Sequence, residues 1–310
     1  MMALQLVPHN TKIDFVGRRF ITFFLATILA VLGTSGYFNG LNFGVDFKGG
    51  HVLEVHMDKE PNLTSLRDNL NHLNLGEVVI QEIGTPKDLM VKVELQDGDD
   101  SAQGNAIEKI KAVLGADHEY RKVATVGPKV GGEMVQNALK AVGLALAAML
   151  IYIAIRFEWQ FAACAIVALA HDCLALLALF SWAGLEFNET SVIAILITAG
   201  YSINDTIVIF DRIRENLRKF KKLELCDIIN KSLNETLSRT MMTATTTLIA
   251  LTALYFMAGP VISAFSFPII IGITVGSFSS ICLASPLLLY MNLPRGDSSK
   301  DAAEKSVNLS

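Results

Sequence analysis

Charged residues are scarce in this chain of 310 residues, at 18% of the sequence, whereas hydrophobic residues make up 52%. Soluble domains have closer to a quarter of their residues charged, and the mean hydropathy here is +0.43. The chain also lacks a glycine-lysine phosphate loop of the Walker type, which excludes the usual P-loop nucleotide site. The sequence therefore predicts an integral membrane protein that does not itself hydrolyse nucleotides.

An excess of positive charge is missing as well. The 26 basic and 30 acidic residues give a net charge of −4, which excludes a nucleic-acid binder that works by bulk charge. The four cysteines, Cys164, Cys173, Cys226 and Cys282, show no CxxC spacing and no ligand cluster. The sequence therefore predicts no disulfide framework, no metal site and no cofactor.

Long apolar runs, in contrast, are abundant. A membrane-spanning helix needs roughly 20 mostly apolar residues. Arg18-Arg19 before the first run resembles the start of a signal peptide, but the run is too long and Leu32-Gly-Thr-Ser-Gly is a poor cleavage site, which predicts a retained anchor. The predicted spans are at about 20–37, 137–155, 161–182, 191–210, 240–258 and 263–290.

Lysine and arginine are concentrated in alternate segments between these spans. The arm 1–19 and the tail 293–310 contain three each, the loop 211–239 contains eight, and the segments 183–190 and 259–262 contain none. Because basic loops stay in the cytoplasm, both termini and the loop 211–239 are expected there. The long segment 38–136 is then outside, and the five later spans form a region at 137–292.

The outside segment has the pattern of a small α+β domain. Apolar stretches predict four strands, and leucine and isoleucine at helical spacing predict two helices, with Thr64 and Ser101 near their starts. The order βαββαβ is typical of a ferredoxin-like domain. The fold class is thus an α-helical polytopic membrane protein with one such domain. The strands are expected at His51–Met57, Val78–Ile83, Leu89–Leu95 and about 119–126.

Ionisable residues inside the spans are the best candidates for function, because each costs about 2.5–3.5 kcal/mol to insert at a helix centre. Asp205 lies in the fourth span and shares a helix face with Thr198 and Ser202. Arg239 lies at the start of the fifth, which is rich in threonine. The supporting candidates are His171, Asp172, Thr198, Ser202, Asn204 and Thr243.

Two polar helix faces at similar depth predict a shared hydrated seam in which Asp205 and Arg239 pair. A carboxylate held ionised by a guanidinium could take up and release a proton as the pair opens and closes, while the arginine stays charged. Two alternatives remain open: a structural ion pair that fixes helix register, or an arginine that extends to the headgroups. Separately, Gly272, Gly276 and Ser280 predict a face for close helix packing.

Five sequence motifs lie in these spans or next to them: Leu41–Gly50 (LNFGVDFKGG), Val126–Glu133 (VGPKVGGE), Ala170–Asp172 (AHD), Gly200–Asn216 (GYSINDTIVIFDRIREN) and Thr236–Thr240 (TLSRT). These motifs resemble those of the SecD/SecF family of protein-export membrane subunits, within the resistance-nodulation-division superfamily. The resemblance extends from about residue 13 to 290, and Lys48 is a departure where a small or hydroxyl residue is more usual.

The resemblance implies a subunit of the bacterial inner membrane that works with SecD beside the SecYEG channel. Asp205 and Arg239 match the family's coupling residues, and the periplasmic domain at 38–136 would help to hold an emerging unfolded polypeptide. The expected function is ATP-independent late translocation and release of secretory polypeptides, driven by the proton motive force, with sodium as the alternative ion. The alternatives are half of a small-molecule exporter and a non-transporting assembly subunit.

Overall fold

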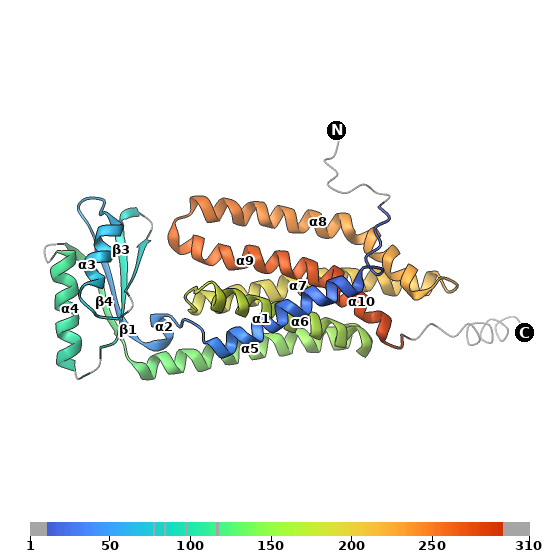
Figure 1. Ribbon diagram of the computed structural model, residues 1–310, viewed down its shortest axis with the longest axis horizontal. Coiled ribbons are helices and arrows are strands. Elements are labelled where there is room, and N and C mark those ends of the chain that lie inside the picture. The colour runs from blue at the N-terminus through green and yellow to red at the C-terminus, as the bar shows by residue number, and fades with distance from the viewer. Residues whose placement is uncertain are drawn as a thin grey trace, which may run out of the picture.

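The computed structural model describes residues 11–293, except for 77, 84, 97, 99, 116 and 117. Figure 1 shows an elongated helical bundle with a small α+β domain at one end. Six helices of the described chain are long and apolar enough to cross a membrane, which confirms the predicted number of spans. They are α1 (Arg19–Asn39), α5 (Pro128–Arg156), α6 (Trp159–Trp182), α7 (Glu189–Lys219), α8 (Leu225–Met257) and α9 (Pro260–Ser279), the last continued to Tyr290 by short helical turns.

The small domain has the predicted ferredoxin-like order. Its sheet runs β2-β3-β1-β4 with every pair antiparallel, and α3 and α4 cover one face of the sheet (Figure 1). Leu53, Leu89 and Ile110 are fully buried between the sheet and the helices. The elements are β1 (Gly50–His56), α3 (Leu63–Asn71), β2 (Val78–Ile83), β3 (Thr85–Glu94), α4 (Asp100–Leu114) and β4 (Glu119–Val126).

The predicted start of α3 is one correction within this domain. The side chain of Asn62, not of Thr64, caps the helix by accepting hydrogen bonds from two backbone N–H groups, at 3.1 and 3.2 Å. An asparagine oxygen satisfies donors that the first turn of a helix leaves open. Ser101 lies just inside the first turn of α4.

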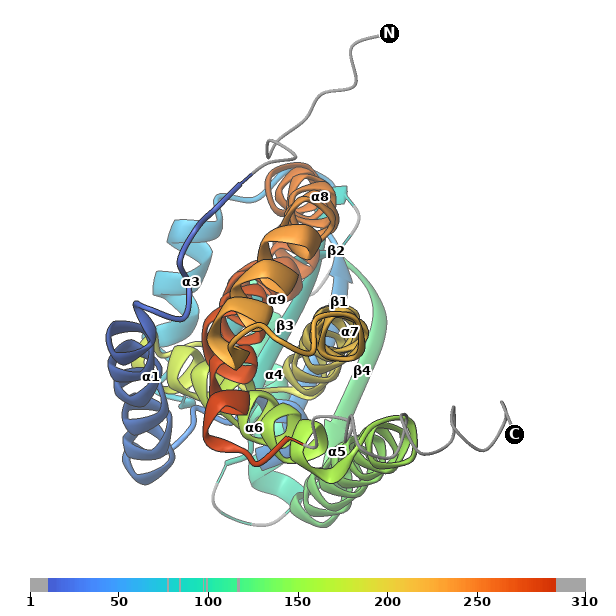
Figure 2. The same cartoon turned by 90° about the vertical axis from the view of Figure 1, so that its right-hand side faces the viewer.

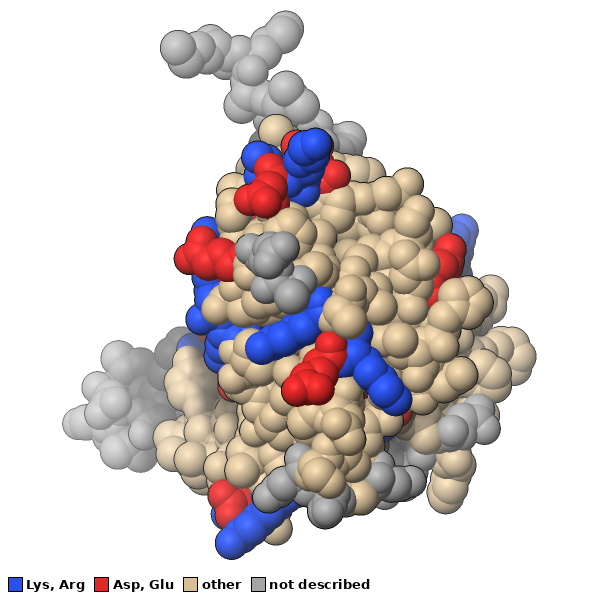
Figure 3. Space-filling view, turned by 90° about the vertical axis from the view of Figure 1, so that its left-hand side faces the viewer, with Lys and Arg blue, Asp and Glu red and all other residues tan. Residues whose placement is uncertain are grey.

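The other face of the sheet has ion pairs instead of a core. Asp88 accepts hydrogen bonds from the Thr85 hydroxyl at 2.6 Å and from Arg121 at 2.9 Å, and contacts the His56 ring at 2.7 Å. The Thr85 and His56 hydrogen bonds hold the pKa of the Asp88 carboxyl below its usual range. Figure 3 looks onto the end of the molecule formed by the small domain, where acidic and basic groups of the described residues are interspersed among broad uncharged areas and form no large field of one sign.

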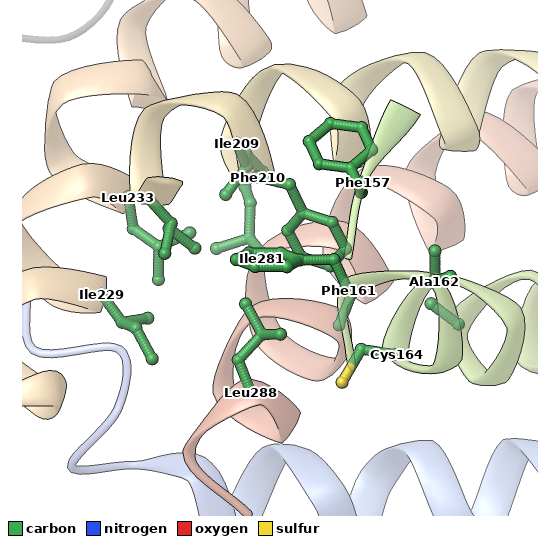
Figure 4. Close-up of a cluster of buried hydrophobic side chains, with 14 of the residues drawn as sticks. Phe157, Phe161, Ala162, Cys164, Ile209, Phe210, Ile229, Leu233, Ile281 and Leu288 are labelled. Atoms are coloured by element: carbon green, nitrogen blue, oxygen red, sulfur yellow. The ribbon is translucent and has the colours of Figure 1, made fainter. Parts of the chain in front are cut away.

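A cluster of buried side chains holds together the end of the bundle farthest from the domain (Figure 4). Phe161 and Phe210 pack edge to face with ring centroids 5.3 Å apart, and Phe157 contacts both. Edge-to-face rings are a favoured arrangement of aromatic side chains. Ile229, Leu233, Ile281 and Leu288 complete the cluster and tie α8 and α9 to α5, α6 and α7.

The sequence predicts a loop over 211–239, but most of this segment is helical. Helix α7 continues to Lys219 and α8 begins at Leu225, so only a short turn separates them. Asn216 donates across this hairpin to Ser232 at 2.9 Å and to Glu235 at 2.8 Å. A prediction from hydropathy ends each span where charged residues begin. The charged helical turns of this hairpin are stabilised by contacts between α7 and α8, which hydropathy does not detect.

The two glycine-rich motifs at 41–50 and 126–133 contact each other. A short helix, α2 (Val45–Lys48), lies against the start of α5, where a Cβ on Gly131 would come within 2.4 Å of the Phe47 carbonyl oxygen. The Asp46 carboxylate pairs with Lys92 of β3 at 3.1 Å. Lys48, the residue that departs from the family motif, pairs with Glu94 at 3.0 Å. These contacts connect the start of α5 to the small domain through α2, and we call them the clasp between α2 and α5.

The predicted small-residue face on α9 packs within the chain, against α7. A Cβ on Gly272 would lie 2.4 Å from the Thr198 hydroxyl, and one on Gly276 would lie 2.9 Å from the Ser202 Cβ. The glycines therefore allow the two backbones to approach closely. A Cβ on Gly143 of α5, in contrast, would meet nothing within 4 Å.

Helix α9 ends in a π-helical turn over Ser280–Ala284. Pro286 has no N–H to donate to the carbonyl of Cys282 four residues earlier, which leaves that oxygen without its helical partner. The hydroxyl of Thr22 on α1 donates to it instead, at 3.0 Å. The Ser280 carbonyl accepts from the Ser285 hydroxyl at 2.9 Å. Wide turns of this kind are often found at functional sites.

Candidate functional site

Asp205 lies at the centre of a polar seam between α7, α8 and α9. Its side chain is only 3% exposed, and its Oδ2 atom has no hydrogen-bond partner in the described structure. Ser277 of α9 lies beside the carboxylate. Thr240 of α8 is 2% exposed, and its hydroxyl also has no partner among the described residues. The sequence analysis missed Ser277, although a serine in an apolar span is a detectable signal.

The same seam contains further buried polar atoms without partners in the described chain. Thr198 and Tyr201 lie about two turns and one turn before Asp205 on α7, and their hydroxyls lack hydrogen-bond partners as well. Buried polar groups are almost always paired, with ordered water where no protein group is available. A row of such atoms around a carboxylate can bind ordered water, as the lining of a hydrated ion path does.

Arg239 does not form the ion pair with Asp205 that the sequence analysis expects. It lies in the middle of α8, not at the start of its helix, and its side chain is exposed. It forms no ion pair with any residue that the structure describes, but it is near enough for its charge to attract the Asp205 carboxylate. The expected position was wrong because α8 begins well before the apolar run.

Asp172 of α6 forms a second polar node, between α6, α7 and α9. Its side chain is 1% exposed, and its Oδ2 accepts hydrogen bonds from Ser202 of α7 at 2.5 Å and from Ser279 of α9 at 2.9 Å. The Nδ1 atom of His171 lies 3.1 Å from Oδ1. Beside it, the hydroxyls of Thr206 and Ser280 are 2.8 Å apart. In contrast to Asp205, this carboxylate has a partner on each oxygen.

The two nodes are connected through short stretches of the same helices. Ser202 lies three residues before Asp205 on α7, and Ser279 lies two residues after Ser277 on α9. Asp172 therefore fixes both helix segments that form the Asp205 seam. We interpret it as a positioning residue, because both of its carboxylate oxygens have hydrogen-bond partners.

Replacing Asp172 with asparagine is expected to lower the free energy of unfolding by about 1–2 kcal/mol, because hydrogen bonds to a charged acceptor are stronger than those to a neutral one. Thermal unfolding in detergent measures this change. Asp227→Asn is the matched control, since Asp227 is exposed at the start of α8. An Asp172→Asn chain as stable as the wild type would contradict the positioning role.

The other predicted residues differ in their placement. Thr198 and Ser202 are buried in the seam or beside it, and His171 is 4% exposed with its Nε2 unpaired among the described groups. Asn204, however, is exposed. Thr243 is exposed and donates to the Thr240 carbonyl of its own helix at 2.9 Å. These last two therefore lie outside the site.

A bundle of six apolar helices, a buried carboxylate in a polar seam and a small domain at one end define a multi-pass membrane transport subunit. Two family patterns match the chain. The pattern described as protein export membrane protein SecD/SecF, C-terminal, matches residues 106–293, and the SecD/SecF GG motif matches residues 34–61. The chain belongs to the SecD/SecF family.

Relatives support this assignment along nearly the whole chain. The protein translocase subunit SecF of Cereibacter sphaeroides is 39% identical over 96% of this chain and 95% of its own length. That of Rickettsia bellii is 41% identical over 92% and 95%. As a SecF-type translocase subunit, the chain is a component of a protein-export transporter and not an enzyme.

Two crystal structures have the same fold. SecDF from Thermus thermophilus has a TM-score of 0.75 and 34% identity, covering 94% of this chain and 39% of that one. SecDF in a super-membrane-facing form has a TM-score of 0.68 and 33% identity, covering 96% and 40%. The chain thus spans about two fifths of these longer SecDF chains.

Proposed function

We propose that this chain couples the movement of an ion across the membrane to a late, ATP-independent step of protein export, with Asp205 as the ion-binding residue. The observation that carries the proposal is the unpartnered Oδ2 of Asp205, 3% exposed and surrounded by hydroxyls that also lack protein partners. A buried carboxylate with no fixed partner is free to exchange a proton or a sodium ion with water.

The cycle begins with Asp205 ionised and attracted by Arg239. Proton uptake neutralises the carboxylate, removes this attraction and releases α8 from α7. Arg239 stays charged throughout, because its guanidinium does not titrate in the physiological range. A proton moving down 100 mV contributes about 2.3 kcal/mol, which shifts a two-state equilibrium by tens-fold. Such a shift is sufficient to drive a domain movement.

SecD is the proposed partner, and the SecYEG channel and an emerging unfolded polypeptide are the proposed neighbours. The similarity to SecDF, a longer chain of which this one covers 39%, supports the first of these. Transporters of this type have repeated halves around an axis along the membrane normal, and one chain of six spans supplies a single half. The small domain would then hold the exported chain while the ion moves.

Both termini and the α7–α8 hairpin are proposed to be cytoplasmic in the bacterial inner membrane, with the ferredoxin-like domain in the periplasm. An impermeant maleimide added to intact spheroplasts is therefore expected to label Ser65→Cys on α3 and not Lys222→Cys in the hairpin turn. Both positions are exposed. Labelling of Lys222→Cys alone would show the opposite orientation and contradict the proposal.

Export in vesicles that contain the chain with SecD and SecYEG tests the function. An imposed ion gradient is expected to speed completion of transfer of a secretory precursor after ATP is removed. A proton ionophore should abolish this effect if protons are coupled, and a sodium ionophore if sodium is. If no gradient affects transfer, the chain is an assembly subunit. Drug accumulation in cells that lack it would instead indicate a small-molecule exporter.

A further inference from the structure

A basic pocket lies where α5 ends beside α7, at the end of the bundle away from the ferredoxin-like domain. Figure 2 looks onto this end, with α5 and α7 as neighbours. The pocket has a volume of about 480 Å³. It is lined by Arg156, Asp211, Arg214, Arg218, Lys219 and Glu215.

The two carboxylates of this pocket are already paired. Arg156 donates to both oxygens of Asp211, at 2.7 and 2.9 Å. Glu215 accepts from Arg212, which is not part of the pocket lining, at 2.6 Å. The acidic side chains therefore do not neutralise the remaining cations of the pocket.

Three cations of the pocket have no carboxylate partner in the described structure: Arg214, Arg218 and Lys219. The Nε atom of Arg214 is buried and has no hydrogen-bond partner among the described residues. A buried guanidinium N–H without an acceptor is costly, and a phosphate oxygen is a strong acceptor for it. The pocket thus has the charge and the free donors of an anion site.

An exposed apolar surface adjoins the pocket on α5. Ile155 is 82% exposed and Ile151 is 59% exposed, so both present apolar side chains to the surroundings within two turns of Arg156. Since α5 is one of the six candidate spans, hydrocarbon chains are the natural solvent of these residues. A headgroup site directly above a surface for acyl chains matches the shape of a phospholipid.

We propose that this pocket binds the headgroup phosphate of an anionic phospholipid, with Arg214, Arg218 and Lys219 as its ligands. Arginine suits this role because its planar fork can bind two phosphate oxygens at once. Basic pockets between membrane helices are known to take anionic headgroups. The site depends on the six spans and not on the ion-coupling role of Asp205.

The experiment uses Trp159, which is 67% exposed and lies three residues after Arg156. The full chain with Trp182→Phe, which leaves Trp159 as the only tryptophan, is placed in vesicles of phosphatidylglycerol and phosphatidylcholine. One of the two lipids is brominated in each sample. Quenching of Trp159 then measures which lipid is enriched beside the pocket.

The wild-type pocket should prefer phosphatidylglycerol. Arg214→Gln is expected to lower this preference about fivefold, as one basic group near an anionic surface is worth about that much. The triple change Arg214→Gln, Arg218→Gln, Lys219→Gln should abolish it. Lys222→Gln, an exposed lysine outside the pocket, is the matched control and should keep it.

Three results would overturn the proposal. They are equal quenching by both brominated lipids in the wild type, a preference that survives the triple change, and an equal loss in the Lys222→Gln control. All samples are kept free of inorganic phosphate. A pocket that takes only a free phosphate ion would then give the first of these results, because phosphatidylglycerol would not be enriched beside Trp159.

Discussion

Vesicles with Asp205→Asn are expected to lose the gradient-driven part of protein export entirely, while the chain still folds and assembles. Asparagine has the shape of aspartate and can pair with the same hydroxyls, but it cannot take up a proton and has no negative charge to attract Arg239 or a sodium ion. The seam would then stay in its neutral state whatever the gradient. Because Asp205 has an oxygen without a fixed partner, its replacement removes no hydrogen bond to Oδ2 in the described structure.

The measurement is the rate of precursor transfer with and without the gradient, at equal amounts of assembled complex. Asp227→Asn is the matched control, since Asp227 is exposed at the start of α8 and outside the seam. Exposed side chains of this kind contribute little, so this control should behave as the wild type. If the gradient response persists in Asp205→Asn, the carboxylate has only a structural role, and the chain is better described as an assembly subunit.

Gly272→Val is expected to destabilise the bundle by about 3 kcal/mol, with loss of export as a consequence. Even the first added carbon would lie 2.4 Å from the Thr198 hydroxyl and 2.6 Å from its methyl group. Thr198 is 1% exposed and β-branched, so it has little freedom to turn away. Helices α7 and α9 must then separate at the seam that holds Asp205.

Thermal unfolding in detergent measures this effect, and Gly143→Val is the matched control. A Cβ on Gly143 meets nothing within 4 Å in the described structure, so the same substitution there should change stability by less than about 1 kcal/mol. Adding Thr198→Ala to Gly272→Val should recover part of the loss, because it removes both clashing atoms. If both glycine variants unfold alike, close packing at Gly272 is not the cause.

The sequence was sufficient to predict the six spans and the ferredoxin-like domain, because both follow from periodicity. Strands β2 and β4 have the predicted limits. Periodicity could not predict α2, which is only four residues long and is held by Asp46 and Gly131 through contacts distant in the chain. Nor could it predict the helical hairpin after Asp211, where buried Ile229 and Leu233 alternate with charged residues and Asn216 donates a hydrogen bond to Glu235.

For the site, insertion cost alone identified Asp205 and Asp172 as candidates. It could not distinguish their environments, because the partners of Asp172 come from α7 and from Ser279, more than 100 residues later. The expected pair with Arg239 rested on where the apolar run of α8 begins. The chain is already helical well before that run, so the start of the apolar run did not show where Arg239 lies along α8.

The clasp between α2 and α5 has a mechanical consequence. Helix α5 is a single rod of 29 residues, about 43 Å long, and it is held at both ends. Arg156 at one end grips Asp211, six residues beyond Asp205 on α7, while Gly131 at the other end is packed against α2 and the sheet domain. A tilt of about 10° at the α7 end would sweep the far end through about 7 Å. A movement too small to open the bundle would thus become a stroke long enough to pull on an extended peptide.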